Sequence, residues 1–394
     1  MTNPVICSAV RTPIGRFNGA FTPLTAMELG GTAIAAALER AQLSGEQVDE
    51  VLMGHVIQAG QGQITARQAA RVADIPMTVP AVTINKVCLS GMTAVADASR
   101  RIRLGEAHFV VAGGMESMTN APYVLSNARQ GLGIGNATLV DALTHDGLWC
   151  AFDHCTMGQS SDLKNQILDI GREEQDEWAA ASHGRAATAT DSGEFADEIA
   201  PVEVAQRKGE PLVVDQDEGI RRGTTVESLS NLRAAFIDNG TITAGNASQV
   251  SDGAAALVVA DRTAAEAAGL PVVAEIISYG QTAGPDATLH ERPAEALRIA
   301  LKHASLEPKD LALCEINEAF AAVSLWSTRM LELDPGRVNV NGGAVALGHP
   351  LGATGARLLV TLINALQHRG GGYGGASLCG GGGQGDAMIL KVSG

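Results

Sequence analysis

The sequence predicts an α/β protein built around a mainly buried sheet. Strand-like apolar runs alternate with Ala-rich helical stretches over residues 1–119, and the same alternation returns from about residue 249 to the end. Residues 120–248 break this rhythm, because they are loop-like to about residue 165 and polar afterwards. Alternating strands and helices are typical of sheets covered on both faces. We therefore expect two α/β halves, with a long insertion in the first.

The individual elements follow from the spacing of apolar residues. In the first half, alternating strands and helices are predicted at residues 3–11, 25–41, 50–57, 81–85, 91–105 and 108–114. The insertion contains a charged helix from about residue 172. Strands and helices then follow at residues 253–260, 272–279, 292–304, 311–317, 337–343, 353–369 and 375–392, with a further helix that ends at about residue 333.

Composition excludes several classes of protein. The chain of 394 residues has a formal net charge of −15, which argues against a general nucleic-acid binder because phosphate contacts need a basic face. No apolar run reaches the ~20 residues that span a bilayer, and the first residues lack a signal-peptide pattern. Six scattered cysteines without paired spacing indicate a reduced compartment and no zinc site. We therefore expect a cytoplasmic protein that binds no nucleic acid, membrane or metal.

Cys88 stands in a polar turn, "NKVCLSG", just before a predicted helix. A thiol at a helix N-terminus lies near the positive end of the helix dipole and near exposed N–H groups, which favours its thiolate. This setting suits a nucleophile, although a lone cysteine is more often a small buried apolar residue. A nearby base would decide between these two interpretations. If a base is paired with Cys88, we expect its thiol to be a thiolate near neutral pH.

Three further residues are candidates to act with Cys88. His349 lies in a glycine-rich turn before another predicted helix, so it is the candidate base, or else an ordinary loop histidine. Cys379 precedes four glycines, whose bare N–H groups can cradle an oxyanion or simply form a flexible turn. Asn317, at a strand end in "NEAF", can hold a water, donate to a developing charge, or cap a helix.

Three weaker patterns carry less information. "GLGIGN" (131–136) lacks the preceding strand and the final glycine of a dinucleotide-binding motif. Two histidines and two cysteines fall between residues 145 and 155, but without the spacing of zinc ligands. Arg221, in "GIRRG", is either an anion contact in an acidic protein or part of a solvated turn.

Taken together, these segments closely resemble the thiolase family. "NKVCLSG", "NEAF", "GGAVALGHPLGATGAR" and "CGGGGQG" are similar to its four signature blocks, in the same order and at the same spacing. "VRTPIGRF", "VAGGMESM" and "GTITAGNASQVSDGAAALVV" extend the likeness over essentially the whole chain.

The resemblance implies a thiolase-like fold, with two similar βαβαβαββ halves forming a layered α-β-α-β-α core. The N-terminal half would be residues 1–119, completed by 249–270, and the C-terminal half residues 271–394. An inserted loop domain, residues 120–248, would cover the coenzyme A site. Residues near 125–145 would form the contact of a homotetramer, a dimer of dimers.

The resemblance also implies a chemistry. An enzyme of this family is an acyltransferase that condenses two acetyl-CoA to acetoacetyl-CoA and coenzyme A, or runs the reverse thiolysis, in a ping-pong cycle without a cofactor. By likeness, Cys88 carries the acyl group, His349 takes its proton, and Cys379 is the acid and base for the second substrate. Asn317 would hold a water that faces the enolate oxygen. The N–H groups of Cys88 and Gly381 would face the oxyanion.

Contacts to coenzyme A also come from the resemblance. Arg221 would lie near the adenine and phosphates and Ser248 near the pantetheine, and the tunnel would be lined by Leu148, Met157, Ala319 and Phe320.

The chain departs from the family pattern at three places: Thr156, where many acetoacetyl-CoA thiolases have histidine, Ser251, and the loop near 281–295. His154 is a candidate replacement for that histidine. Because two departures lie near the expected acyl pocket, acetyl-CoA acetyltransferase activity is the first expectation and a longer-chain 3-ketoacyl-CoA thiolase of fatty-acid β-oxidation is the alternative. A non-catalytic acyl-CoA or lipid-binding relative is more distant, because all four catalytic positions are filled.

Overall fold

The computed structural model describes residues 4–394, which fold around one mixed sheet. Two runs of strands meet at a short antiparallel contact between β1 and β13. The N-terminal half-sheet consists of β1 (Pro4–Arg11), β12 (Ser251–Asp261), β5 (Phe109–Ser117), β3 (Glu50–Gly54) and β4 (Ala81–Ile84), with β2 (Gly15–Arg16) beside β12. The C-terminal half-sheet consists of β13 (Ala274–Ala283), β16 (Gln384–Val392), β15 (Gly372–Gly380) and β14 (Leu311–Ile316).

The two half-sheets share one strand order. In each, the first strand pairs antiparallel with the last, which pairs antiparallel with a central strand, β5 or β15. The central strand then pairs parallel with β3 or β14. In the N-terminal half-sheet a further parallel strand, β4, pairs with β3. The C-terminal half-sheet has no such strand beside β14 among the described residues, only a single parallel bridge between Cys314 and Val338. This repeated topology confirms the predicted fold class.

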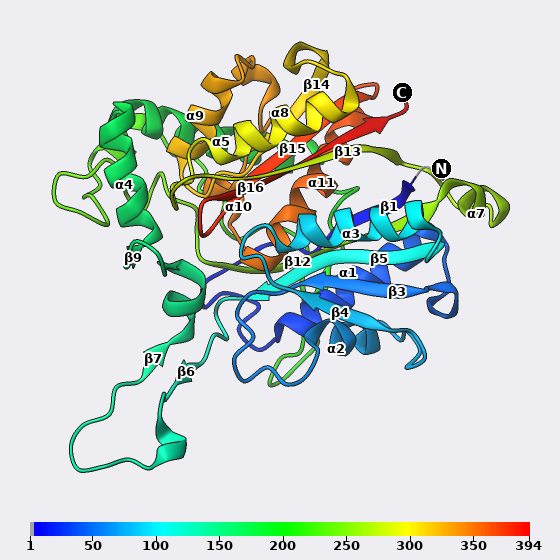
Figure 1. Ribbon diagram of the computed structural model, residues 1–394, viewed down its shortest axis with the longest axis horizontal. Coiled ribbons are helices and arrows are strands. Elements are labelled where there is room, and N and C mark those ends of the chain that lie inside the picture. The colour runs from blue at the N-terminus through cyan, green and yellow to red at the C-terminus, as the bar shows by residue number, and fades with distance from the viewer. Residues whose placement is uncertain (1–3) are drawn as a thin grey trace.

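Helices cover the outer faces and fill the space between the half-sheets, which gives five layers (Figure 1). The outer helices are α1 (Ala26–Ala41) and α2 (Thr65–Val72) on the N-terminal side and α8 (Arg292–Ala304) with α9 (Ala321–Met330) on the other. The middle helices are α3 (Ser90–Leu104) and α11 (Leu351–His368). Residues 351–366 are all buried, as expected for a helix with apolar residues on every side.

Glycines bring the two middle helices close to their neighbours. A Cβ on Gly355 of α11 would collide with the backbone of Met92 in α3, and a Cβ on Gly114 of β5 would collide with the carbonyl of Gly352. Only glycine permits this close approach of backbone to backbone. As a result the first turns of α3 and α11 pack directly against each other.

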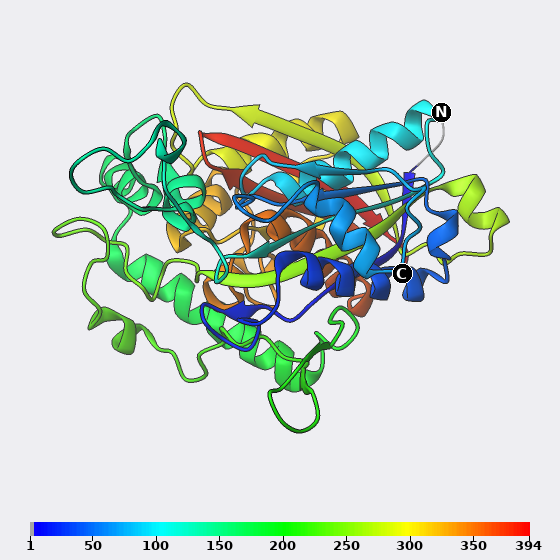
Figure 2. The same ribbon diagram turned by 90° about the horizontal axis from the view of Figure 1, so that it is seen from below.

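The insertion forms a separate group of short elements beside the layered core. Its two-stranded pairs are β6 (Tyr123–Val124) with β7 (Val140–Asp141), β8 (Trp149–Cys150) with β9 (Cys155–Thr156), and β10 (Val202–Val204) with β11 (Leu212–Val214). Its helices are a π-helix (Leu143–Leu148), α4 (Met157–Leu168), α5 (Arg172–Ser192) and α6 (Val226–Ser230). α5 is the charged helix expected from the sequence, and it runs along the edge of the core (Figure 2).

The β6–β7 segment projects well away from the core (Figure 1). The remaining helices, α7 (Arg262–Ala267) and α10 (Ala344–Leu347), are short. Among residues 4–394, no helix is both long and apolar enough to cross a membrane. The domain boundaries given above stay a prediction.

Candidate active site

Cys88 lies in a tight turn between β4 and α3, two residues before the helix begins at Ser90. The side chain of Asn85 accepts a hydrogen bond from the N–H of Val87 at 3.1 Å, and the Ser90 hydroxyl accepts one from the N–H of Lys86 at 2.8 Å. These bonds hold Val87 at φ 51°, in the left-handed region that a β-branched residue rarely adopts. The turn therefore places Cys88 directly after a strained residue.

Burial controls the charge state of Cys88. The residue is 9% exposed, and this burial raises the pKa of its thiol to about 12, against the opposing effect of the N–H groups of Cys88 itself and Gly381. Desolvation outweighs the helix-end effect, so the helix end alone does not produce the thiolate expected near neutrality. A base must take the proton when the sulfur reacts.

His349 lies between α10 and α11, and its ring is held at both nitrogens. Its Nδ1 is 2.6 Å from the hydroxyl oxygen of Thr354, and that hydroxyl donates its proton to the carbonyl of Pro350 at 2.8 Å. The hydroxyl must therefore accept from an Nδ1–H, which leaves Nε2 unprotonated and able to accept a hydrogen bond. Nε2 faces the side-chain nitrogen of Asn317 at 3.5 Å.

Burial keeps this histidine neutral. Desolvation first, and then the positive charge of Arg357, lowers the pKa of His349 to about 3. Asn317 follows β14 and is completely buried behind the ring, and its side-chain oxygen has no hydrogen-bond partner among the described residues. A neutral imidazole with an unprotonated Nε2 is the form a general base requires.

Cys379 lies near the end of β15, beside the first turn of α3. Burial, and next the proximity of Cys88, raises the pKa of its thiol. The glycines that follow turn the chain sharply, with Gly382 at φ 82° and Gly383 at φ 69°. This turn directs the N–H of Gly381 at the sulfur of Cys88.

The three residues meet in one narrow pocket. Besides Cys88, His349, Cys379 and Gly381, it is lined by the sequence-predicted Leu148, Met157, Ser248, Ala319 and Phe320. Its volume, about 60 Å³, is small. Five other lining residues were not predicted from the sequence: Val87, Gly147, Leu289, Leu351 and Gly380. Leu289 falls in the loop noted as unusual, so its departure from the family pattern was the available signal.

Outside this lining lie Asn317, Arg221, Thr156 and His154, which were singled out from the sequence. Arg221 is exposed in the turn before α6, outside the pocket lining, and its backbone N–H binds Nδ1 of His183 at 3.1 Å. Thr156 accepts a hydrogen bond from the N–H of Gln159 at 3.2 Å and so caps α4. His154 is exposed in the β8–β9 turn.

Comparison with known proteins identifies the family. Residues 4–263 match the family model for the thiolase N-terminal domain, and residues 270–392 match the model for the thiolase C-terminal domain. The chain belongs to the thiolase family. Curated relatives include a protein named probable acetyl-CoA acetyltransferase from Mycolicibacterium smegmatis, 50% identical over 98% of this chain and 100% of that protein.

Two further similarities cover nearly the whole chain. The acetyl-CoA acetyltransferase of Pseudomonas aeruginosa is 49% identical over 99% of each protein. Among solved structures, the Bacillus anthracis acetyl-CoA acetyltransferase superposes with a TM-score of 0.97 at 41% identity, covering 100% of this chain and 99% of that one. The thiolase fold is therefore established for this chain.

One buried carboxylate of this thiolase fold was missed from the sequence. Glu116, at the end of β5, accepts hydrogen bonds from the N–H groups of Val56 and Ile57, both at 3.1 Å, and of Gly352 at 2.8 Å. Its oxygen is also 3.3 Å from Nε2 of His55. Because Gly352 belongs to the first turn of α11, Glu116 anchors the helix that follows His349.

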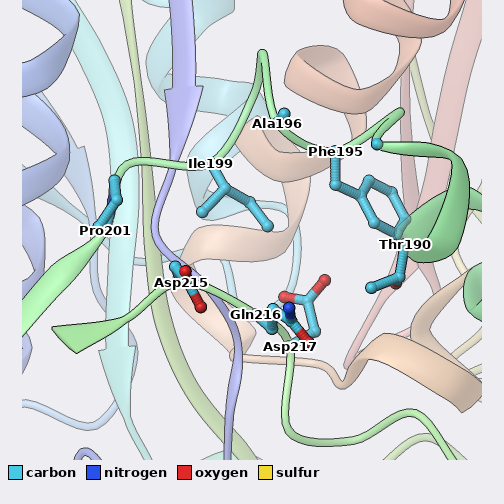
Figure 3. Close-up of a pocket in the computed structure, with 9 residues that line it drawn as sticks. Thr190, Phe195, Ala196, Ile199, Pro201, Asp215, Gln216 and Asp217 are labelled. Atoms are coloured by element: carbon cyan, nitrogen blue, oxygen red, sulfur yellow. The ribbon is translucent and has the colours of Figure 1, made fainter. Parts of the chain in front are cut away.

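A larger pocket shares no lining residue with the pocket that holds Cys88, His349 and Cys379 (Figure 3). It has a volume of about 310 Å³, and Phe195 and Ile199 face Asp215 and Asp217 across it. Both oxygens of Asp217 already accept hydrogen bonds from Arg11, at 2.7 and 2.9 Å. None of the sequence-predicted site residues lines it, so pocket size does not identify the reactive site. In the described part of the chain, no group of three or more His, Cys, Asp or Glu side chains is arranged to hold a metal ion.

Proposed function

We propose that this protein is an acyltransferase that condenses two acetyl-CoA to acetoacetyl-CoA and coenzyme A, and that also cleaves acetoacetyl-CoA in the reverse reaction. The observation that carries the proposal is the meeting of Cys88, His349, Cys379 and the N–H of Gly381 in one apolar pocket. The full-length similarity to proteins named acetyl-CoA acetyltransferase supports the same reaction. Coenzyme A thioesters are the substrates, and no cofactor is needed.

The first half-reaction transfers an acetyl group to Cys88. Nε2 of His349 takes the thiol proton as the sulfur attacks the thioester carbonyl, and the carbon–sulfur bond to coenzyme A breaks. The released coenzyme A thiolate takes the proton of Cys379, which becomes a thiolate. The N–H groups of Cys88 and Gly381 are supported as the oxyanion hole, because both already point at the Cys88 sulfur.

The second half-reaction forms the carbon–carbon bond. The Cys379 thiolate removes an α-proton from the second acetyl-CoA, and the resulting carbanion attacks the acetyl carbonyl on Cys88. Acetoacetyl-CoA leaves, and His349 returns its proton to the Cys88 sulfur, so the starting state is restored. His349 and a water held by Asn317 would stabilise the enolate oxygen, and the unpartnered side-chain oxygen of Asn317 supports that water site.

The small volume of the pocket supports a short acyl group. Met157, Leu289 and Phe320 close it, and about 60 Å³ of free space does not hold an extended fatty chain without rearrangement. Ser248 lies in the lining, where it would contact the pantetheine. Arg221 would bind the adenine and phosphates farther out, and its exposed position is compatible with that role.

The test is thiolysis of acetoacetyl-CoA set against 3-keto-octanoyl-CoA, with the wild type and Cys88→Ala. We expect turnover of the four-carbon substrate only, lost in the variant by a factor of about 10⁴ or more. Comparable activity on the longer chain would assign the protein to fatty-acid oxidation instead. Inactivity toward both, with coenzyme A still bound, would favour a non-catalytic relative.

We further propose a homotetramer located in the cytoplasm. The projecting segment between β6 and β7 exposes Leu132, Ile134 and Leu139, and apolar side chains gathered on a projection favour contact with another subunit. All six cysteines are free thiols, which is typical of a reduced compartment. Light scattering of the wild type and of a Leu132→Ser, Ile134→Ser variant tests the assembly, and an unchanged tetramer would exclude this segment as the contact.

A further inference from the structure

Two cysteines that the proposed chemistry does not use face each other beside the pocket. In the β8–β9 ribbon, Cys150 is the direct antiparallel partner of Cys155. Side chains of directly opposed residues in such a pair lie on the same face, with Cβ atoms about 4.5–5.5 Å apart. A disulfide needs Cβ atoms only slightly closer, about 3.5–4.5 Å. A small movement of the ribbon therefore suffices to join the two sulfurs.

The surroundings of the two thiols differ. Cys150 is 2% exposed, and its sulfur accepts a hydrogen bond from the N–H of Asp153 at 3.3 Å. Cys155 is only partly buried. Desolvation is the largest cause that raises the pKa of its thiol, and the neighbouring Asp153 and Cys150 raise it further, as expected if the two sulfurs lie near each other. A reagent from solution therefore reacts with Cys155 first, and the buried Cys150 can react only in a second step.

The ribbon contacts the proposed active site at three points. Leu148 directly precedes β8 and Met157 directly follows β9, and both line the pocket. At the tip, the ring of Phe152 lies against Gly382, where an added Cβ would come within 3.1 Å of it. Gly382 is in the turn that carries Gly381, so a change in the ribbon acts on both walls of the pocket.

We propose that Cys150 and Cys155 form a dithiol modification site that reacts with low-molecular-weight disulfides, such as coenzyme A disulfide or glutathione disulfide. The Cys155 thiolate attacks one sulfur of the reagent, its S–S bond breaks, and one thiol is released. The Cys150 thiolate then attacks the Cys155 sulfur of the mixed disulfide and releases the second thiol. The two cysteines are oxidised to one disulfide, the reagent is reduced to two thiols, and the two cysteine protons go to the thiols released.

The cross-link lowers activity by changing the ribbon. The sulfurs approach each other when β8 and β9 draw together, and this displaces Leu148 and Met157 from their positions in the pocket lining. Displacement by about 1 Å at a reacting centre costs up to about a hundredfold in rate. Reduction by dithiothreitol reverses the change.

The first experiment measures the cross-link without using activity. Cys88→Ala protein, which lacks the thiol that carries the acyl group, is treated with coenzyme A disulfide, alkylated and analysed by peptide mass spectrometry. We expect one disulfide between Cys150 and Cys155, and its absence when Cys155→Ser is added. Unmodified thiols, a lasting mixed disulfide on Cys155, or a disulfide elsewhere would overturn the proposal. Because this measurement needs no turnover, it stands or fails independently of the proposed acyltransferase activity.

The second experiment measures the effect on turnover. Wild type and Cys155→Ser, both active when reduced, are oxidised with glutathione disulfide in the presence of acetyl-CoA, which masks Cys88 as the thioester. We expect a loss of about tenfold in kcat/KM for the wild type alone, restored by dithiothreitol. Equal losses in both proteins would mean that another cysteine is responsible. Cys150→Ala is the second variant, should the serine disturb the ribbon.

Discussion

The ends of the two central strands, β5 and β15, occupy equivalent places in the two half-sheets but carry different chemistry. Glu116 on β5 lies opposite Gly253, and Cys379 on β15 lies opposite Gly385, each glycine being near the start of its strand. Glu116 binds the first turn of α11, which belongs to the C-terminal half. Cys379 lies beside Cys88 at the start of α3, which belongs to the N-terminal half. Each half therefore supplies one side chain to the helix start of the other.

The difference lies in what each side chain contacts. Glu116 is fully buried and accepts three backbone N–H groups, so its carboxylate is held in place by the scaffold. Cys379 lines an apolar pocket next to another thiol. The same position of the fold therefore serves two purposes. Where the side chain has all its hydrogen-bond partners, as Glu116 has, it holds two segments together, and where it faces an open pocket, as Cys379 does, it is free to react. Substitutions at the two positions should therefore separate stability from turnover.

The largest effect is expected for Cys379→Ala. Losing the acid and base for the second substrate should lower kcat by about 10³-fold, within the usual range for such groups. Acetylation of Cys88 by labelled acetyl-CoA should still occur, and the thermal midpoint should barely change. Cys314→Ala, which removes another buried thiol on β14, is the matched control. If both variants lose the same activity, Cys379 has no special role and the comparison fails.

A smaller effect, on stability, is expected for Glu116→Gln. The amide turns an N–H₂ group toward backbone donors, and leaving buried N–H groups unpaired costs about 1–3 kcal/mol in the free energy of unfolding. Urea denaturation measures this loss, with the exposed Glu46→Gln as control. Turnover per folded molecule should fall far less than in Cys379→Ala. A stable protein without turnover would instead place Glu116 in the chemistry.

The smallest effect concerns the proton on Cys88. Because its folded-state pKa is raised to about 12, the thiolate fraction grows with pH throughout the neutral range. Iodoacetamide labelling of Cys88 should therefore accelerate about tenfold per pH unit between about pH 7 and 9. Peptide mass spectrometry follows the label, and acetyl-CoA should protect the residue. A plateau below pH 8 would show that the helix end stabilises the thiolate after all.

The sequence predicted the reactive residues better than their environment. Cys88, His349 and Cys379 stand in short polar or glycine-rich segments whose residue types have few other uses, so their meeting in one pocket could be anticipated. Glu116 and Thr354 also stand in segments resembling the family, but their roles depend on contacts across 236 and 5 positions of chain, respectively. Nothing in the local pattern indicates such partners.

The balance of effects on the charge of Cys88 could not be predicted for a related reason. A helix end and its exposed N–H groups can be inferred from sequence, and both do lower the pKa of a thiol. The degree of burial depends on how the insertion and both halves close over the pocket, and here desolvation is the larger effect. The departure of its loop from the family pattern was the signal available for Leu289, but that departure does not show that the side chain reaches the pocket.

The left-handed backbone of Val87 has a consequence for engineering. Glycine adopts that conformation without the penalty of about 1–2 kcal/mol that a side chain incurs. Val87→Gly would also give the unfolded chain more conformational freedom and would remove an apolar side chain that packs against the core, so it should not make the protein more resistant to heat. The same replacement would loosen the turn that holds Cys88. A library selected for turnover should therefore keep a side chain at position 87.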